Sequence, residues 1–158
     1  MSTSELTRSE TDRRLYALPG VGTLRRRGWT SRAASAEADG RRWEIARRGI
    51  WHPWVEAVDP AGATTGRFTT RGLSRGGTLW WMERELALRP ASRWREHYAL
   101  VDGERELAVI EARGWGRRPV KVTVDDPAAL ETGLLLFAVF VVQGLADDSA
   151  AASVVSSG

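Results

Sequence analysis

The sequence predicts a mainly β domain, either a closed β-barrel or a strongly curved sheet, wrapped around one central helix. Residues 134–142, Leu-Leu-Leu-Phe-Ala-Val-Phe-Val-Val, contain no polar side chain. A helix over these residues is apolar on every face, so protein or lipid must surround it. The chain before it is divided by turn residues into short strands about ten residues apart, without a helical period. A sheet with one apolar face needs a cover, and this helix is the candidate.

Residues 1–20 are expected to form a disordered N-terminal arm. Their first part is polar and rich in Ser, Thr and Glu, a composition that offers little apolar surface to bury. The segment also lacks the continuous apolar run of a secretory signal, so a cytoplasmic location is expected, with peripheral attachment to a membrane as an extension of it.

The barrel is predicted to occupy residues 21–146 and to contain three recognisable hairpins. Asp-Gly is a preferred pair in two-residue hairpin turns, and an Asp-Pro sequence suits a type I or II turn. These turns lie at 39–40, 59–62 and 102–103, between strands expected at 33–38 and 41–48, 54–58 and 64–70, and 94–101 and 106–112.

Alternation of apolar and polar residues indicates which strand faces are buried. Val120, Val122 and Val124 alternate with Lys121 and Thr123, as in a half-buried strand.

For two further pairs of residues, the sequence predicts which face of the strand each side chain occupies. Leu107 and Val109 are expected to share the apolar face of their strand. Trp80 and Trp81 are adjacent, so a strand directs their rings to opposite faces. One of the two should lie in the core and the other outside it.

The helix is expected over residues 127–146, followed by a disordered tail at 147–158. Asp126 suits the N-cap and Pro127 the first helical position. Such a helix is ~30 Å long, so a tail-anchored membrane span is an alternative. Glu131 within the segment argues against a span, as do the acidic pairs at 125–126 and 147–148, because neither flank carries Lys or Arg. A buried helix is therefore preferred.

Charge is distributed unevenly along the chain, whose net charge is +3. Residues 21–124 carry 20 bases and 12 acids, whereas residues 125–158 carry five acids and no base. A basic body suits anionic partners such as phospholipid headgroups or nucleic acid. The alternative is a codon bias that enriches arginine without a binding role, since Lys121 is the only lysine.

An internal repeat relates residues 55–72 to residues 98–114 at an offset of about 43. Together with the Asp-Gly hairpins, the apolar C-terminal helix and the stretch Tyr98-Ala-Leu-Val-Asp-Gly-Glu-Arg-Glu-Leu107, this layout resembles the tubby C-terminal-like fold, in its LURP-one-related and phospholipid scramblase branch. The resemblance implies a barrel of about twelve strands, in two related halves, closed around the hydrophobic helix. It also implies a lipid-associated role, because relatives bind phosphoinositides or are implicated in lipid scrambling.

Motifs for catalysis are missing from the sequence, and the protein is expected not to be an enzyme. The chain contains no cysteine, and its only histidines are His52 and His97, whereas metal sites need several convergent ligands. No Gly-rich phosphate loop, nucleophile elbow or HExxH motif occurs. No cofactor and no metal are expected.

The candidate binding site is a rim of arginines and tryptophans that clusters at strand ends could form. Arginine contacts phosphates through two donors at once, and tryptophan suits a membrane interface. The predicted ligand is an anionic phospholipid headgroup, with a protein partner as a second possibility. A nucleic-acid-binding barrel is a further alternative, and a small-ligand carrier would need a deep pocket with convergent polar groups. The candidate residues are Arg25, Arg26, Arg27, Trp29, Arg47, Arg48, Trp115, Arg117 and Arg118.

Overall fold

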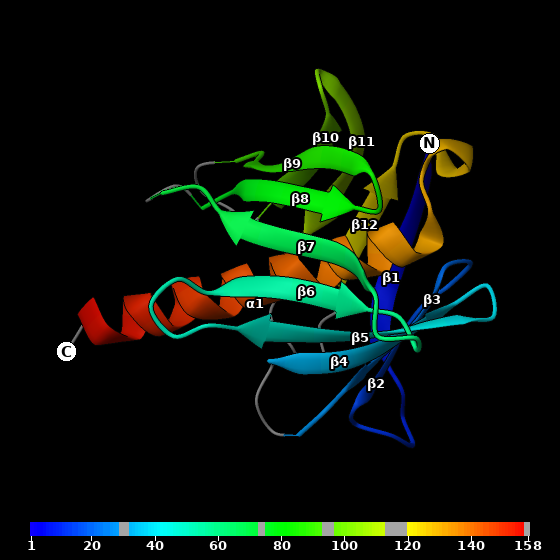
Figure 1. The fold of residues 1–158 in the computed structure, drawn as a ribbon, viewed down its shortest axis with the longest axis horizontal. Coiled ribbons are helices and arrows are strands. Elements are labelled where there is room, and N and C mark those ends of the chain that lie inside the picture. Colours follow the sequence, from blue (N-terminus) through cyan, green and yellow to red (C-terminus); the bar gives the residue numbers. More distant parts are fainter. Residues whose placement is uncertain (29–31, 73–74, 93–96, 113–119, 157–158) are drawn as a thin grey trace.

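A computed structural model describes residues 1–28, 32–72, 75–92, 97–112 and 120–156. These residues form a closed antiparallel barrel of twelve strands with one long helix through it (Figure 1). Each strand pairs with its neighbours in the sequence, and β1 pairs with both β2 and β12, which closes the barrel. The predicted fold class is confirmed.

Every strand is short, and the helix follows the last of them. The strands are β1 (Ser2–Arg8), β2 (Leu15–Leu18), β3 (Gly22–Arg26), β4 (Ala33–Ala38), β5 (Arg41–Arg48), β6 (Trp54–Val58), β7 (Thr64–Thr70), β8 (Gly77–Trp81), β9 (Arg84–Pro90), β10 (His97–Asp102), β11 (Arg105–Glu111) and β12 (Val120–Val124). A short 3-10 helix, η1 (Pro127–Ala129), precedes the helix α1 (Thr132–Ser156).

The three predicted hairpin turns are confirmed by the strand pairing. β4 pairs with β5 around 39–40, β6 with β7 around 59–63, and β10 with β11 around 103–104. Trp81 is buried and Trp80 is 36% exposed, so the two rings lie on opposite faces as expected.

The prediction that residues 1–20 are disordered is wrong, because they form β1 and β2 and complete the barrel. Leu6, Tyr16 and Leu18 are all buried in the core. The composition of β1 resembles that of a disordered segment, because most of its side chains are polar and only Leu6 is buried. Its order comes from the backbone, since hydrogen bonding to β12 on one side and β2 on the other satisfies its polar groups.

The helix differs from its predicted bounds at both ends. Asp126 does act as an N-cap, accepting a hydrogen bond from the backbone N–H of Ala128 at 3.1 Å, with Pro127 next to it. However, it caps only η1, because Leu130 has an extended backbone (φ −123°, ψ 118°) that interrupts the helix. α1 then begins at Thr132 and continues to Ser156, through most of the tail that was expected to be disordered.

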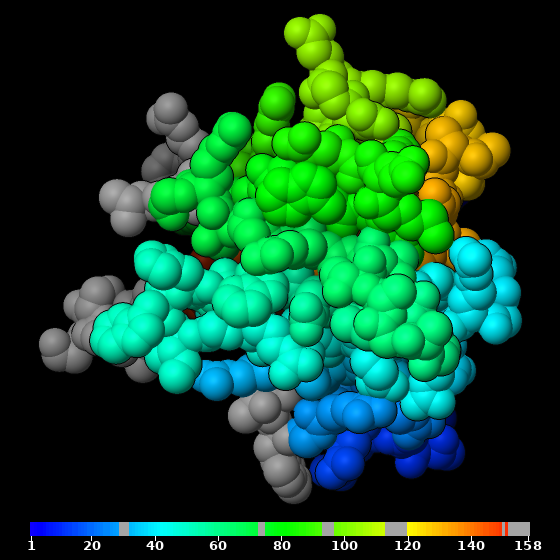
Figure 2. Space-filling model, in the orientation of Figure 1, coloured from blue at the N-terminus to red at the C-terminus, as the bar shows by residue number. Residues whose placement is uncertain are grey.

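The core of the barrel is α1 together with the inward faces of the strands. Every residue from Leu134 to Val142 is buried. The Trp81 ring lies 5.8 Å from Phe137 of α1 and 5.6 Å from Trp43 of β5, measured between centroids. In Figure 2 the strands cover most of α1 on the face shown. The absence of a polar face on the helix is therefore explained by protein on all sides.

Two side-chain hydrogen bonds hold the start of α1 at one end of the barrel. The indole Nε1 of Trp81 donates to Oε2 of Glu131 at 2.9 Å, and Oγ1 of Thr132 donates to Oδ2 of Asp39 at 2.7 Å. Since Trp81 belongs to β8 and Asp39 to the β4–β5 turn, these bonds fix the position of the helix along the barrel axis.

Within the described residues, α1 is the one helix whose length and composition suit a membrane span. The matching window is Thr132–Ser149, and 67% of it is buried inside the protein. In this structure the barrel provides the apolar surroundings that a bilayer would otherwise supply.

Bulges in two hairpins change which side chains face the core. The register shifts between Leu100 and Val101 in the β10–β11 pair, and between Ala57 and Val58 in the β6–β7 pair. These positions are 43 residues apart, the offset of the internal repeat. The prediction that Leu107 and Val109 share the buried face is wrong: Leu107 is buried at the bulge, whereas Val109 is only half-buried.

Two glycines on α1 predict substitutions of opposite effect. A Cβ atom on Gly133 would approach the rings of Trp43 and Trp81 to 2.7 and 2.8 Å, whereas one on Gly144 would meet nothing within 4 Å. Gly133→Ala should therefore lower the free energy of unfolding by about 1–3 kcal/mol through overpacking. Gly144→Ala should raise it by up to about 1 kcal/mol through helix propensity. Urea denaturation followed by circular dichroism measures both, and a neutral Gly133→Ala would contradict the tight packing at the start of α1.

Candidate ligand-binding rim

The two ends of the barrel differ in charge, because connections between antiparallel strands alternate between them. The helix-start end contains the connections 19–21, 39–40, 59–63, 82–83, 103–104 and 125–131. These carry seven acids and neither Arg nor Lys.

The opposite end is the one from which the last part of α1 projects (Figure 1), and we call it the helix-exit rim. Its described connecting residues are 9–14, 27–28, 32, 49–53, 71–72, 75–76, 91–92 and 112. They carry six arginines and two acids, while α1 adds Asp147 and Asp148. The connections are thus basic at this rim and acidic at the helix-start end. Arginines at strand starts, Arg41, Arg42, Arg84 and Arg105, offset part of the acidic charge at the helix-start end.

The predicted arginines at the ends of β3 and β5, with Arg27 just after β3, lie at this rim, but most are paired with acids. Arg25 forms an ion pair with Asp12, and the Arg27 Nη2 lies 2.8 Å from Glu44 Oε1. The Arg48 Nε lies 2.9 Å from Glu56 Oε1.

These three arginines are more than half exposed, where an ion pair contributes only about 0.2–1 kcal/mol. A phosphate group can therefore displace the paired carboxylates from these arginines at a low cost in free energy.

Asp12 is the one described group whose pKa is clearly shifted. The backbone N–H of Arg14 donates to its Oδ1 at 3.0 Å, and this hydrogen bond, with the guanidinium of Arg25, lowers the pKa of the carboxyl below its usual value. Asp12 therefore stays ionised as the pH falls to the usual pKa of an aspartate. Its ion pair with Arg25 is lost only when the pH falls through the lowered pKa.

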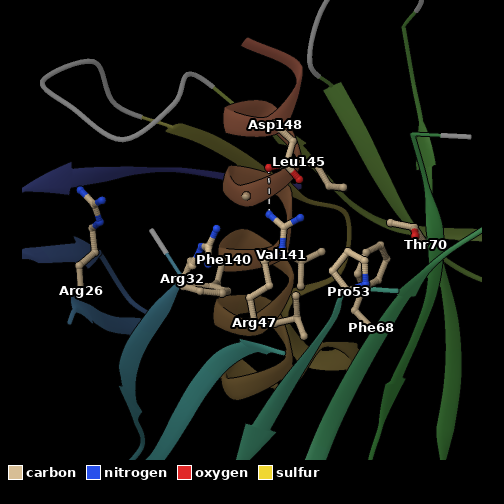
Figure 3. A pocket seen from close by; sticks show the side chains of 12 residues that line it. Arg26, Arg32, Arg47, Pro53, Phe68, Thr70, Phe140, Val141, Leu145 and Asp148 are labelled. Atoms are coloured by element: carbon tan, nitrogen blue, oxygen red, sulfur yellow. Dashed lines mark hydrogen bonds and ion pairs between the residues drawn. The ribbon is translucent and has the colours of Figure 1, made fainter. Parts of the chain in front are cut away.

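Arg26 and Arg47 both line one pocket at the rim. The pocket lies between α1 and the strands β3 to β7, and Arg32, just before β4, also lines it (Figure 3). Nη1 of Arg47 lies 2.9 Å from Oδ1 of Asp148 on α1. This contact links the barrel wall to the helix where the helix leaves the barrel.

The other predicted site residues, Trp29, Trp115, Arg117 and Arg118, lie outside the described residues. His52 is exposed, and His97 Nε2 lies 3.9 Å from Glu111 Oε1. Across the part of the chain that the structure describes, no group of three or more His, Asp or Glu side chains could hold a metal ion.

Sequence reasoning missed a strongly exposed feature of the rim, the tip of the β5–β6 hairpin. Ile50 and Trp51 are 91% and 90% exposed. Gly49 makes the turn possible, with φ at +78° and room for no Cβ, which would lie 2.8 Å from the carbonyl oxygen of His52. The signal in the sequence was two large apolar residues side by side between Gly49 and Pro53, in a position where turns are normally polar.

Comparison of the chain with family models, with curated proteins and with solved structures found no match.

The Arg47–Asp148 contact predicts a local effect on the end of α1. Asp148→Asn should speed amide hydrogen exchange in residues 145–149 while lowering the free energy of unfolding by less than about 1 kcal/mol, because both side chains are partly exposed. Asp147→Asn is the matched control, since it removes the same charge about 100° around the helix. Equal exchange in both variants would contradict an anchoring role for Arg47.

Proposed function

We propose that this protein is a non-enzymatic domain that docks on anionic phospholipid surfaces through its helix-exit rim. The observation that carries the proposal is the exposed pair Ile50 and Trp51 at the tip of a hairpin on the basic rim. In water, these side chains gain nothing from their exposure. In the headgroup region of a bilayer, both can bury apolar surface, and tryptophan is enriched at that depth.

The charge distribution supports the same orientation. Arginines close to an anionic leaflet contribute about 1 kcal/mol each to attraction, and they lie at the rim that presents Ile50 and Trp51. The connections at the helix-start end carry seven acids and no base, which favours an approach with the hairpin tip first.

We also propose that the chain is a relative of the tubby C-terminal-like fold. The support is architectural: a twelve-stranded antiparallel barrel is closed around an apolar helix that follows the last strand. Relatives with lipid-associated roles make a membrane surface a consistent ligand.

Sedimentation with vesicles tests the proposal. Vesicles of phosphatidylcholine with phosphatidylserine should bind the protein at low salt, and pure phosphatidylcholine vesicles should bind it far less. Raising the salt concentration should weaken binding because it screens the arginines.

The double variant Ile50→Ser with Trp51→Ser should weaken vesicle binding at least about ten-fold, from the loss of buried apolar surface. Its stability should not change, since both side chains are exposed. Met82→Ser is the matched control, because Met82 is 54% exposed at the helix-start end. If wild type fails to bind anionic vesicles, or the double variant binds them equally well, the membrane proposal is wrong. A protein partner for the rim would then be the alternative to pursue.

A further inference from the structure

The pocket between α1 and the barrel wall combines an apolar interior with a basic mouth. Its volume is about 310 Å³, at the lower end of the range for small-molecule sites. The apolar lining comes from three strands or connections and from the helix: Pro53, Val55, Phe68, Phe140, Val141 and Leu145. Phe68, Phe140 and Val141 are almost fully buried, so the interior walls belong to the rigid core.

The charged lining residues come from the parts of the chain near the end where α1 leaves the barrel. In Figure 3 the guanidinium groups of Arg32 and Arg47 point toward the outer end of the helix, whereas Phe68 and Val141 lie deeper. The lining holds three arginines and one acid, Asp148, which is already paired with Arg47. The mouth therefore retains a net positive charge after that ion pair is counted.

From this arrangement we infer that the pocket binds a single-chain amphiphile with an anionic head, such as a medium-chain fatty acid. The apolar interior takes the alkyl chain, and the carboxylate stays at the mouth near Arg32. A polar ligand such as a sugar would leave those hydroxyls that enter the apolar interior without partners, at a cost for each unpaired group. A two-chain phospholipid is too large, since the space equals that of about ten water molecules.

The inference does not depend on membrane docking. Ile50 and Trp51 are not among the lining residues, so the pocket and the docking tip are separable sites on the same rim.

Gly144 offers a direct way to close the pocket. It lines the cavity on α1, and a Cβ there would meet no atom within 4 Å. Gly144→Leu should occupy part of the space with its own side chain, and so shorten the alkyl chain that fits, while improving helix propensity. Gly144→Ala is the matched control, because it makes the same change in backbone freedom and leaves most of the volume open.

The experiment is calorimetric titration of the protein with saturated fatty acids of increasing length, each below its critical micelle concentration. Binding should be one to one and should strengthen about four-fold for each added methylene that is buried. The gain should stop at the length that fills the cavity. Partition into a nonspecific apolar surface would continue to strengthen with length, and that result would overturn the inference.

The variants separate the two parts of the pocket. Gly144→Leu should weaken laurate binding at least about ten-fold, whereas Gly144→Ala should bind as wild type does. Arg32→Gln should weaken binding of laurate about ten-fold, as expected for losing one charge-assisted hydrogen bond, and should leave dodecanol binding unchanged. Equal binding of laurate by wild type and Gly144→Leu, or by wild type and Arg32→Gln, would overturn the assignment. Thermal denaturation shows whether each variant is folded; if Gly144→Leu is not, Arg32→Gln and the chain-length limit decide.

Failure of this inference is distinguishable from failure of the proposed function. The Ile50→Ser, Trp51→Ser variant should retain laurate binding while losing vesicle binding. If the wild type binds laurate but not vesicles, the pocket proposal holds and the docking proposal is wrong. If the wild type binds vesicles but shows no saturable laurate binding, the docking proposal holds and the pocket proposal is wrong.

Discussion

The structure depends on the mutual burial of one apolar helix and the inner face of a closed sheet. Leu134–Val142 has no polar side, so it needs contacts on every side, and the sheet has an apolar face that would otherwise meet water. The helix covers the apolar face of the sheet, and the sheet surrounds the apolar helix. The contacts at the start of α1 are close enough that Gly133 has no room for a methyl group beside Trp43 and Trp81. The path of the helix in turn determines where the pocket and the exit rim lie.

The sequence was informative where local chemistry and burial agree. Asp-Gly turns, the alternation in β12 and the unbroken apolar run each reflect one physical constraint, and each was predicted correctly. Prediction was wrong where order comes from a distant partner. β1 has a single buried side chain and is held by β12, more than a hundred residues later. The start of α1 was misplaced because Asp126 and Pro127 cap a short 3-10 turn, and nothing local indicates the extended Leu130.

The candidate site was predictable in its location more than in its chemistry. Arginines at alternate connections must gather at one end of an antiparallel barrel, and those of β3 and β5 do so. Their partners come from other segments: Asp12, Glu44, Glu56 and Asp148. Such pairing needs the register of the strands and the exit path of the helix, neither of which the sequence displays. The pocket likewise exists only because α1 leaves the barrel beside β5, β6 and β7.

The order of the elements along the chain has a consequence for biosynthesis. All twelve strands precede α1, so a ribosome produces the entire sheet before the segment that fills it. At ~5–20 residues per second, the nascent sheet waits a few seconds for its core. During that time its apolar inner face is open and aggregation-prone. A molecular chaperone that shelters the nascent chain until α1 emerges would therefore improve the yield of folded protein.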